Sequence, residues 1–223
     1  MKFDAILFDF DGVLIESEYA GNRHLAECLS ALGKPTTAAE AMDAFMGLSG
    51  DHFLEAVERH LGRPLPDSFH AERAGEAARA LREGVEEVGG ARAFIRALPG
   101  DFPRAIASSS SSEWIRAHLA HLGVEDQFGP HVYSGREHVR RGKPAPDIYL
   151  HAARQLGVPI ERTVILEDSP VGVTGAVASG AHVIGLCAGS HCSPAHAAAL
   201  QALGVQDVAA DFAAVARIIG LPA

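Results

Sequence analysis

Hydrophobic positions change their spacing along the chain, and the change separates two kinds of segment. Short apolar runs that end in polar residues indicate strands buried on both faces of a parallel sheet. Apolar residues three or four positions apart, bounded by Gly or Pro, indicate amphipathic helices. The runs that predict strands are 5–8, 104–108, 131–134, 163–166 and 182–186.

Helical patterns fill most intervals between these predicted strands. They cover residues 91–98, 112–122, 146–156, 170–179, 194–203 and 211–219. Alternation of strands and helices is the signature of βαβ units. We therefore expect an α/β fold with a doubly wound, Rossmann-like parallel sheet.

One long interval, residues 17–83, carries several helical patterns and no convincing strand. Thr37 and Glu40, for example, have the spacing of a capping box before a short helix. Because an all-helical insert at the ligand-binding end of a sheet can act as a lid, the interval is expected to form a cap. The expected domains are an α/β core of residues 1–15 and 88–223 and a helical cap of residues 16–87.

Composition narrows the classes of partner. The chain has 223 residues, 48% of them hydrophobic, which is enough to bury a substantial core. Its net charge is −9 and its Lys and Arg residues are scattered, so neither nucleic acid nor an acidic membrane surface is an expected partner. No apolar stretch approaches the roughly 20 residues of a membrane span, and the N-terminus lacks a signal-peptide layout. We expect a cytoplasmic protein that is a monomer or a weak homodimer.

Cysteine usage argues against a disulfide framework. Cys28, Cys187 and Cys192 are odd in number and form no Cys-x-x-Cys pair. His191 and His196 flank Cys192 in the nearest approach to a metal-binding cluster, but the spacing matches no zinc pattern. These three residues are interpreted as loop and helix-start residues.

Carboxylates follow two of the predicted strands. Asp9 ends the first run, with Asp11 and Gly12 just after it, and Glu167 and Asp168 end the fourth. An isolated Asp-x-Asp could merely polarise a surface loop. Two acidic strand ends side by side would instead raise at least one pKa unless a cation neutralised them. Mg²⁺ suits carboxylates, and the lack of thiolate or imidazole in these motifs argues against zinc there.

Two further segments carry groups suited to a phosphoryl group. Ser108 and Ser109 end an apolar run with hydroxyls, although a serine run also serves as a helix cap. Lys143 stands between Gly142 and Pro144 in a stiff segment, where the alternative is an ordinary solvated lysine. A rigidly held ammonium is a useful point charge beside a carboxylate and a phosphate.

In this order, the four segments resemble the motifs of the haloacid dehalogenase superfamily, a family of phosphatases and phosphotransferases. The matching segments are Phe8–Leu14, Ser108, Gly142–Asp147 and Leu166–Ser169. The resemblance covers essentially the whole chain. The insert directly after the first motif is similar to the helical-cap subgroup, which includes β-phosphoglucomutase-like proteins and sugar phosphate phosphatases.

The resemblance implies a role for each matching residue. Asp9 would be the nucleophile that accepts the phosphoryl group, and Asp11 the acid that protonates the leaving oxygen and then activates water. Asp11 also argues against a true dehalogenase, because a halide needs no proton to leave. The residues expected to bind the substrate phosphate are Gly12, Ser108, Ser109 and Lys143. The expected ligands of Mg²⁺ are Asp9, Asp11 through its backbone carbonyl, Glu167 and Asp168.

Three functions remain open. The first is a Mg²⁺-dependent phosphatase that hydrolyses a small sugar or polyol phosphate through an aspartyl phosphate. The second is a β-phosphoglucomutase-like mutase, but Gly21 and the loop 45–50 lack the cap histidine, lysine and arginine of those sequences. The third is a non-catalytic metabolite-binding protein on the same fold, against which the intact Asp9, Asp11, Lys143 and Asp168 argue.

Overall fold

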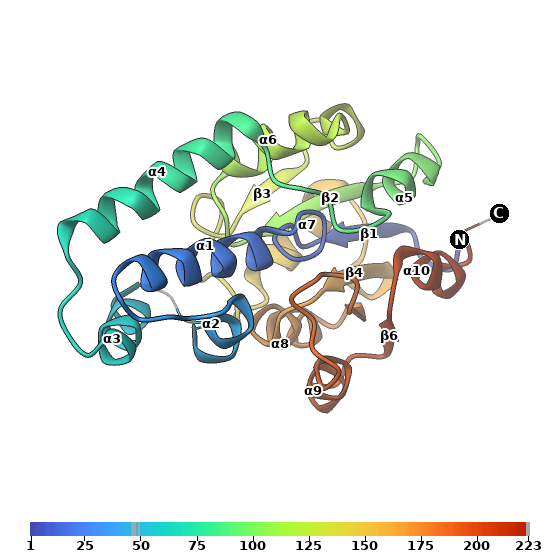
Figure 1. Ribbon diagram of the computed structural model, residues 1–223. Helices are drawn as coiled ribbons and strands as arrows, with labels where there is room; N and C mark the ends of the chain where they lie inside the picture. Colours follow the sequence, from blue (N-terminus) through green and yellow to red (C-terminus); the bar gives the residue numbers. More distant parts are fainter. Residues whose placement is uncertain (46–47, 49, 222–223) are drawn as a thin grey trace. The chain divides into compact units, whose positions relative to one another are not determined.

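The computed structural model describes residues 1–45, 48 and 50–221. The chain forms two compact units (Figure 1). One consists of Met1–Glu16 and the chain from Glu86 onward, and it holds the sheet. The other is Ser17–Val85 and is helical.

The sheet of the α/β unit is parallel throughout and has the strand order β3-β2-β1-β4-β5-β6. This confirms the predicted fold class. Phe8 in β1 stands opposite Ile106 on one side and Leu166 on the other, so three strands end at the same edge. The strands are β1 (Ala5–Phe8), β2 (Arg104–Ser108), β3 (Val132–Ser134), β4 (Thr163–Glu167), β5 (His182–Leu186) and β6 (Asp207–Ala209).

Helices cover both faces of this sheet, and successive residues of β1 face opposite layers. Leu7 belongs to the core cluster that includes Tyr149 of α7, whereas the Phe8 ring lies 6.2 Å from that of Phe94 in α5. Continuous burial on both faces explains why β1 reads as an unbroken apolar run. The helices of the unit are α5 (Ala91–Ala97), α6 (Ser112–Leu122), α7 (Asp147–Leu156), α8 (Pro170–Ser179), α9 (His196–Ala202) and α10 (Phe212–Ile219), with short 3-10 turns at Glu125–Gln127 and Ile160–Arg162.

Side-chain caps fix where the helices near the strand ends begin. The Ser111 hydroxyl accepts the amide of Trp114 at the start of α6, and the Ser169 hydroxyl accepts the amide of Gly172 at the start of α8. Each such cap satisfies an amide that the helix itself leaves without a partner. Both helices therefore begin directly beyond the sheet edge that carries the acidic residues.

The described residues of the helical unit form four helices around an apolar cluster of their own. The capping box that was predicted before α2 is present, with the Thr37 amide donating to Glu40 and the Glu40 amide donating to Thr37. The cluster includes Leu25, Leu29 and Val57. The helices are α1 (Ser17–Ala31), α2 (Ala38–Phe45), α3 (Gly50–Leu61) and α4 (Asp67–Glu83).

The two segments that join the α/β unit to the insert are paired with each other. Glu16 donates its amide to the Glu86 carbonyl at 2.9 Å, and Val88 donates to Leu14 at 3.0 Å. Ile15 and Glu87 form an antiparallel bridge between these two contacts. Both connections are therefore held as one short two-stranded ladder.

The structure differs from the sequence pattern mainly at the last strand and, by one or two residues, at the ends of other elements. The pattern does not indicate β6, because its residues Asp207 and Val208 are only half-buried at the edge of the sheet. β4 extends to Glu167, one residue beyond the predicted apolar run. Among the described residues, no helix combines the length and apolar character needed to cross a membrane.

Candidate active site

Three carboxylates meet where β1 and β4 end. Asp9 directly follows β1 and donates its amide to the Leu166 carbonyl at 3.0 Å. Asp9, Glu167 and Asp168 each contribute a carboxylate oxygen to a group whose members lie within 4.8 Å of one another, and all three side chains are buried. The parallel register thus brings together the acidic residues that the sequence placed at two separate strand ends.

Lys143 joins this group from the loop before α7. Its ammonium lies 2.7 Å from Asp9 Oδ1 and 2.6 Å from Glu167 Oε1, and its side chain is only 4% exposed. The nitrogen also lies 5.1 Å from the centre of the Tyr149 ring. Burial lowers the pKa of Lys143, but the carboxylates of Asp9 and Glu167 outweigh it and hold that pKa above its usual value. Lys143 is thus a fixed cation and not a solvated surface lysine.

Glu167 is surrounded by donors from its own chain. Its Oε1 accepts the Tyr149 hydroxyl at 2.6 Å as well as Lys143. Its Oε2 accepts the amides of Asp168 and Ser169 at 3.1 and 3.2 Å, and the Ser169 hydroxyl at 3.2 Å. These contacts suit a carboxylate that holds Lys143 in place. Its role as a metal ligand stays a prediction.

Negative charge exceeds positive charge among these buried groups. Burial, and then repulsion from Glu167 and Asp168, raises the pKa of Asp9 well above its ordinary value, although Lys143 opposes the change. A bound divalent cation would reverse this and favour the charged form of Asp9. A buried donor set made only of oxygens fits Mg²⁺, and Asp9 and Asp168 are the residues that could hold it.

Asp11 and Gly12 lie in the loop after β1. The Asp11 carboxylate accepts the Ser110 hydroxyl at 2.5 Å and the Trp114 indole N–H at 3.1 Å. Gly12 has a φ of +76°, and a Cβ at this position would overlap the Asp168 carboxylate. The loop therefore needs a glycine here both for its backbone conformation and for the close approach of Asp168.

The predicted serine pair is divided between the interior and the surface. Ser108 ends β2 with 1% exposure, and its hydroxyl accepts the Ser110 amide at 3.1 Å. Ser109 is exposed. The structure thus brings Asp9, Lys143, Glu167 and Asp168 into contact, and the phosphate-binding roles of Gly12, Ser108 and Ser109 stay predictions.

Four residues that touch the acidic groups were not singled out for those contacts by the sequence. Ser110 belongs to the serine run, and Trp114 is the single tryptophan of the chain. Neither feature of the sequence indicates a contact with Asp11. Tyr149 lies among the apolar positions of α7, and His191 donates from Nε2 towards Asp168 Oδ2 at 2.8 Å. Each contact joins positions at least 18 apart in the sequence, which no local spacing reveals.

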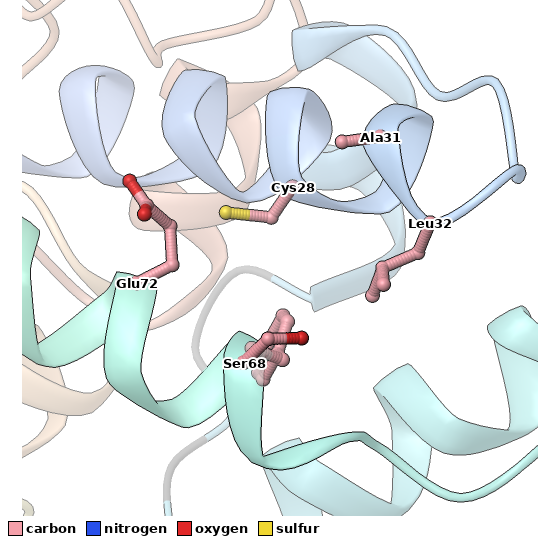
Figure 2. A pocket seen from close by; sticks show the side chains of 6 residues that line it. Cys28, Ala31, Leu32, Ser68 and Glu72 are labelled. Carbon is pink, nitrogen blue, oxygen red and sulfur yellow. The ribbon is translucent and has the colours of Figure 1, made fainter.

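The helical unit has a cavity of its own between α1 and α4 (Figure 2). Its volume is about 240 Å³. The residues that line it are Cys28, Ala31, Leu32, Ser68, Phe69 and Glu72. Mostly apolar atoms with one carboxylate do not suit a phosphoryl group, so the carboxylate and lysine cluster is the candidate active site.

Comparison with known families agrees with the order of the four motifs. The haloacid dehalogenase-like hydrolase family matches residues 3–180. The chain belongs to this family. The resemblance predicted from the motifs is therefore confirmed, and the protein is an enzyme of the hydrolase class.

Relatives of this hydrolase are phosphatases by name. A 6-phosphogluconate phosphatase from Escherichia coli strain K12 is 26% identical over 195 residues, 86% of each chain. Hexitol phosphatase A from the same organism is 32% identical over 187 residues, 82% of this chain and 83% of the relative. A family hydrolase from Deinococcus radiodurans R1, solved with bound phosphate and sodium, is 35% identical with a TM-score of 0.88, and the match covers 100% of this chain and 99% of that one.

Proposed function

We propose that this hydrolase is a Mg²⁺-dependent phosphatase of a small sugar or polyol phosphate and that it acts through an aspartyl phosphate on Asp9. The observation that carries the proposal is the Asp9 carboxylate, held by Lys143 at a strand end beside Asp168. The names of the relatives, which include phosphatases of 6-phosphogluconate and hexitol phosphates, support the substrate class.

Asp9 would attack phosphorus, so that a bond from its carboxylate oxygen to phosphorus forms while the ester oxygen leaves. Asp11 would give a proton to that leaving oxygen and would then take a proton from the water that attacks the aspartyl phosphate. Two easier displacements replace one very slow hydrolysis. Inorganic phosphate and the free hydroxyl compound are the products.

The other residues would align and neutralise the transferring group. Lys143 fixes the orientation of Asp9 through its contact with Oδ1 and lies where it can offset the charge of the phosphoryl oxygens. The proposed phosphate contacts beside Lys143 are Ser108 at the end of β2, Ser109 directly after it, and Gly12 in the loop after β1. Mg²⁺, held by Asp9, Asp168 and the Asp11 carbonyl, with Glu167 as the remaining predicted ligand, would supply charge neutralisation at the phosphoryl group.

The mutase alternative depends on cations in the helical unit. Gly21 occupies α1 where those sequences have a histidine. In the cap loop, Met46, Gly47 and Ser49 lie outside the described residues. The absence of these cap cations is therefore known from the sequence alone. It favours transfer of the phosphoryl group to water over transfer to a second sugar phosphate. Membership of a hydrolase family argues against the non-catalytic alternative.

The test is phosphate release from sugar, polyol, short-acid and nucleotide phosphates, measured with Mg²⁺ or with EDTA. We expect Mg²⁺-dependent turnover that Asp9→Asn abolishes. Asp4→Asn is a matched control, because it removes an exposed carboxylate just before β1 that pairs with Arg162, away from the site. Turnover by Asp9→Asn would exclude the covalent mechanism, and bisphosphate-stimulated isomerisation of a sugar phosphate would favour the mutase.

A further inference from the structure

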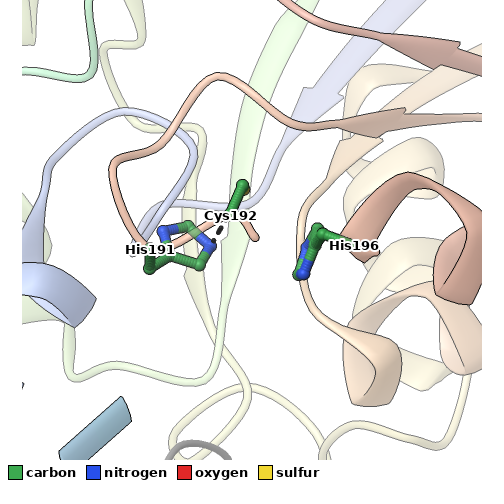
Figure 3. A group of neighbouring side chains, drawn as sticks. All are labelled: His191, Cys192 and His196. Atoms are coloured by element: carbon green, nitrogen blue, oxygen red, sulfur yellow. Dashed lines mark hydrogen bonds between the residues drawn. The ribbon is translucent and has the colours of Figure 1, made fainter. Parts of the chain in front are cut away.

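A second group of potential metal ligands lies beside Asp168, in the segment between β5 and α9. His191 and Cys192 belong to the turn in this segment, and His196 is the first residue of α9. One ligand atom from each of the three lies within 4.8 Å of the other two. Figure 3 shows the Cys192 side chain between the two imidazole rings.

The contacts within this group are close. Cys192 Sγ lies 3.5 Å from His191 Nε2, and the two histidine rings are 5.6 Å apart between centroids at an angle of 89°. The thiol of Cys187, directly after β5, is close enough to that of Cys192 to interact with it. Both histidines are buried and both cysteines are half-buried and free, so solvent competes little for the ligand atoms.

Neighbouring groups hold the two histidines in place. His196 Nε2 lies 2.6 Å from the Asp168 carbonyl oxygen, which can only accept a hydrogen bond. Nε2 therefore carries the proton, and Nδ1 has the lone pair that a metal needs. A histidine that binds a metal generally donates its other N–H to such a carbonyl. For His191, Gly189 provides the space, because a Cβ there would overlap the ring.

We propose that His191, Cys192 and His196 form a binding site for a zinc-class ion, with the Cys187 thiol beside it. Imidazole nitrogen and thiolate sulfur are the ligands of zinc and similar borderline-soft ions, whereas the neighbouring carboxylates suit Mg²⁺. Binding displaces protons from the ligating atoms and needs no oxidant or reductant. The spacing in the sequence did not indicate this site, because its ligands come from one turn and the adjoining helix start.

The site is coupled to the candidate active site through His191. The nitrogen that faces Cys192 is the one that also contacts Asp168 Oδ2 at 2.8 Å. A zinc-class ion that displaces the proton of this nitrogen to solvent removes a hydrogen-bond donor from Asp168 and places positive charge beside it. Such an ion therefore weakens Mg²⁺ binding, and Mg²⁺ weakens its binding by the same factor. This effect on activity rests on the proposed function; the binding itself does not.

The first experiment titrates reduced, metal-free protein with Co²⁺ and then with Zn²⁺. We expect a thiolate-to-cobalt charge-transfer band that one equivalent of Zn²⁺ removes. Cys192→Ser should lose the band and bind Zn²⁺ at least about 100-fold more weakly, since loss of a second-sphere partner alone costs about 10–100-fold. Cys28→Ala is the matched control, because it removes the buried thiol of the helical unit and should bind Zn²⁺ like the native protein.

Two results would overturn the proposal. One is the absence of the charge-transfer band in the native protein. The other is equal Zn²⁺ affinity in Cys192→Ser and native protein, which would place the ion on the carboxylates instead. His196→Gln is a second variant, because a glutamine can still donate to the Asp168 carbonyl but lacks the imidazole ligand, and it should also lose tight Zn²⁺ binding.

The coupling is measured as the Zn²⁺ dissociation constant with and without Mg²⁺. We expect Mg²⁺ to raise this constant in the native protein and Zn²⁺ to lower phosphate release there, with basal release unchanged in Cys192→Ser. Zn²⁺ affinity that is independent of Mg²⁺ would overturn the coupling. The cobalt band and the zinc stoichiometry need no turnover, so they remain informative if no phosphate ester is hydrolysed, and their absence leaves the phosphatase proposal intact.

Discussion

Lys143 is tolerable in the interior only because of the carboxylates beside it. An isolated buried charge costs several kcal/mol, and Asp9 and Glu167 offset that cost at distances of 2.7 and 2.6 Å. Lys143 does not offset the cost of burying the carboxylates in the same way, because its one ammonium faces three of them. The metal-free site therefore carries surplus negative charge on Asp9, whose pKa is raised first by burial and then by Glu167.

Asp9→Asn should stabilise the metal-free protein at neutral pH. A raised folded pKa means that the ionised form of Asp9 costs stability, and this cost is fully present above the folded pKa and absent below the unfolded one. We expect a gain in the free energy of unfolding of about 0.5–2 kcal/mol, the usual range for a single stabilising substitution. Urea unfolding in EDTA across a pH series measures it.

The advantage of Asp9→Asn should shrink as the pH falls towards the unfolded pKa of the acid. Asp4→Asn is the control of opposite sign, because hydrogen bonding to Arg162 lowers the pKa of Asp4, so its carboxylate contributes stability above its unfolded pKa. A destabilised Asp9→Asn at neutral pH would contradict surplus negative charge as the dominant effect.

Asp11→Asn should separate the two chemical steps. A sugar alkoxide needs a proton to leave, whereas 4-nitrophenolate does not, so the first step with 4-nitrophenyl phosphate should stay fast. The second step still lacks its base, and a burst of nitrophenolate before slow turnover is expected. Turnover of the sugar phosphate should fall by about 10²–10⁴-fold. Stopped-flow absorbance measures the burst, and its absence would assign Asp11 a different role.

The ends of β1 and β4 bring the residues of the site together, and the sequence pattern indicates where both strands end. Each predicted strand is buried on both faces over most of its length, so its apolar run is continuous. Register then carries Asp9 and Glu167 to one edge, which parallel pairing predicts without coordinates. β6 escapes the pattern because Asp207 and Val208 are only half-buried, whereas all three residues of β3, the strand at the other edge, are buried and follow a predicted run.

Contacts between distant elements are the part that sequence could not provide. Asp11 meets Ser110 and Trp114 across 99 and 103 positions, because α6 begins just beyond β2. The Tyr149 hydroxyl reaches Glu167 only because α7 packs under the sheet. These partners depend on packing, whereas the four motifs depend on local residue order.

Two glycine substitutions test whether the loop after β1 constrains Asp168. Gly12→Ala and Gly33→Ala both place a Cβ at positive φ, +76° and +89°, and the backbone conformation alone should cost each about 1–2 kcal/mol. At Gly33 a Cβ meets nothing within 4 Å, whereas at Gly12 it overlaps the Asp168 carboxylate. Only Gly12→Ala should lose the Mg²⁺-induced rise in melting temperature. Equal Mg²⁺ responses would mean that the loop does not constrain Asp168.

Every residue assigned to the candidate active site lies in the α/β unit, although the insert interrupts that unit directly after the first motif. A bound ligand stabilises the unit that forms its site. The gain is about 2.7 kcal/mol when the ligand concentration is 100 times the dissociation constant. Mg²⁺ should therefore slow amide exchange at the ends of β1 and β4 and leave α2–α4 unchanged. Hydrogen-exchange mass spectrometry measures this. Equal slowing in the helical unit would contradict a metal site confined to the α/β unit.

The paired connections at Leu14–Glu16 and Glu86–Val88 have a consequence for the evolution of the chain. Because the ladder brings the entry and the exit of the insert together, the insert leaves and rejoins the α/β unit at one place, as the loop of a hairpin does. A recombination event that trades one helical insert for another would leave the acidic strand ends untouched. Such an exchange would replace the helical unit in a single step, while every residue of the candidate active site would be inherited unchanged.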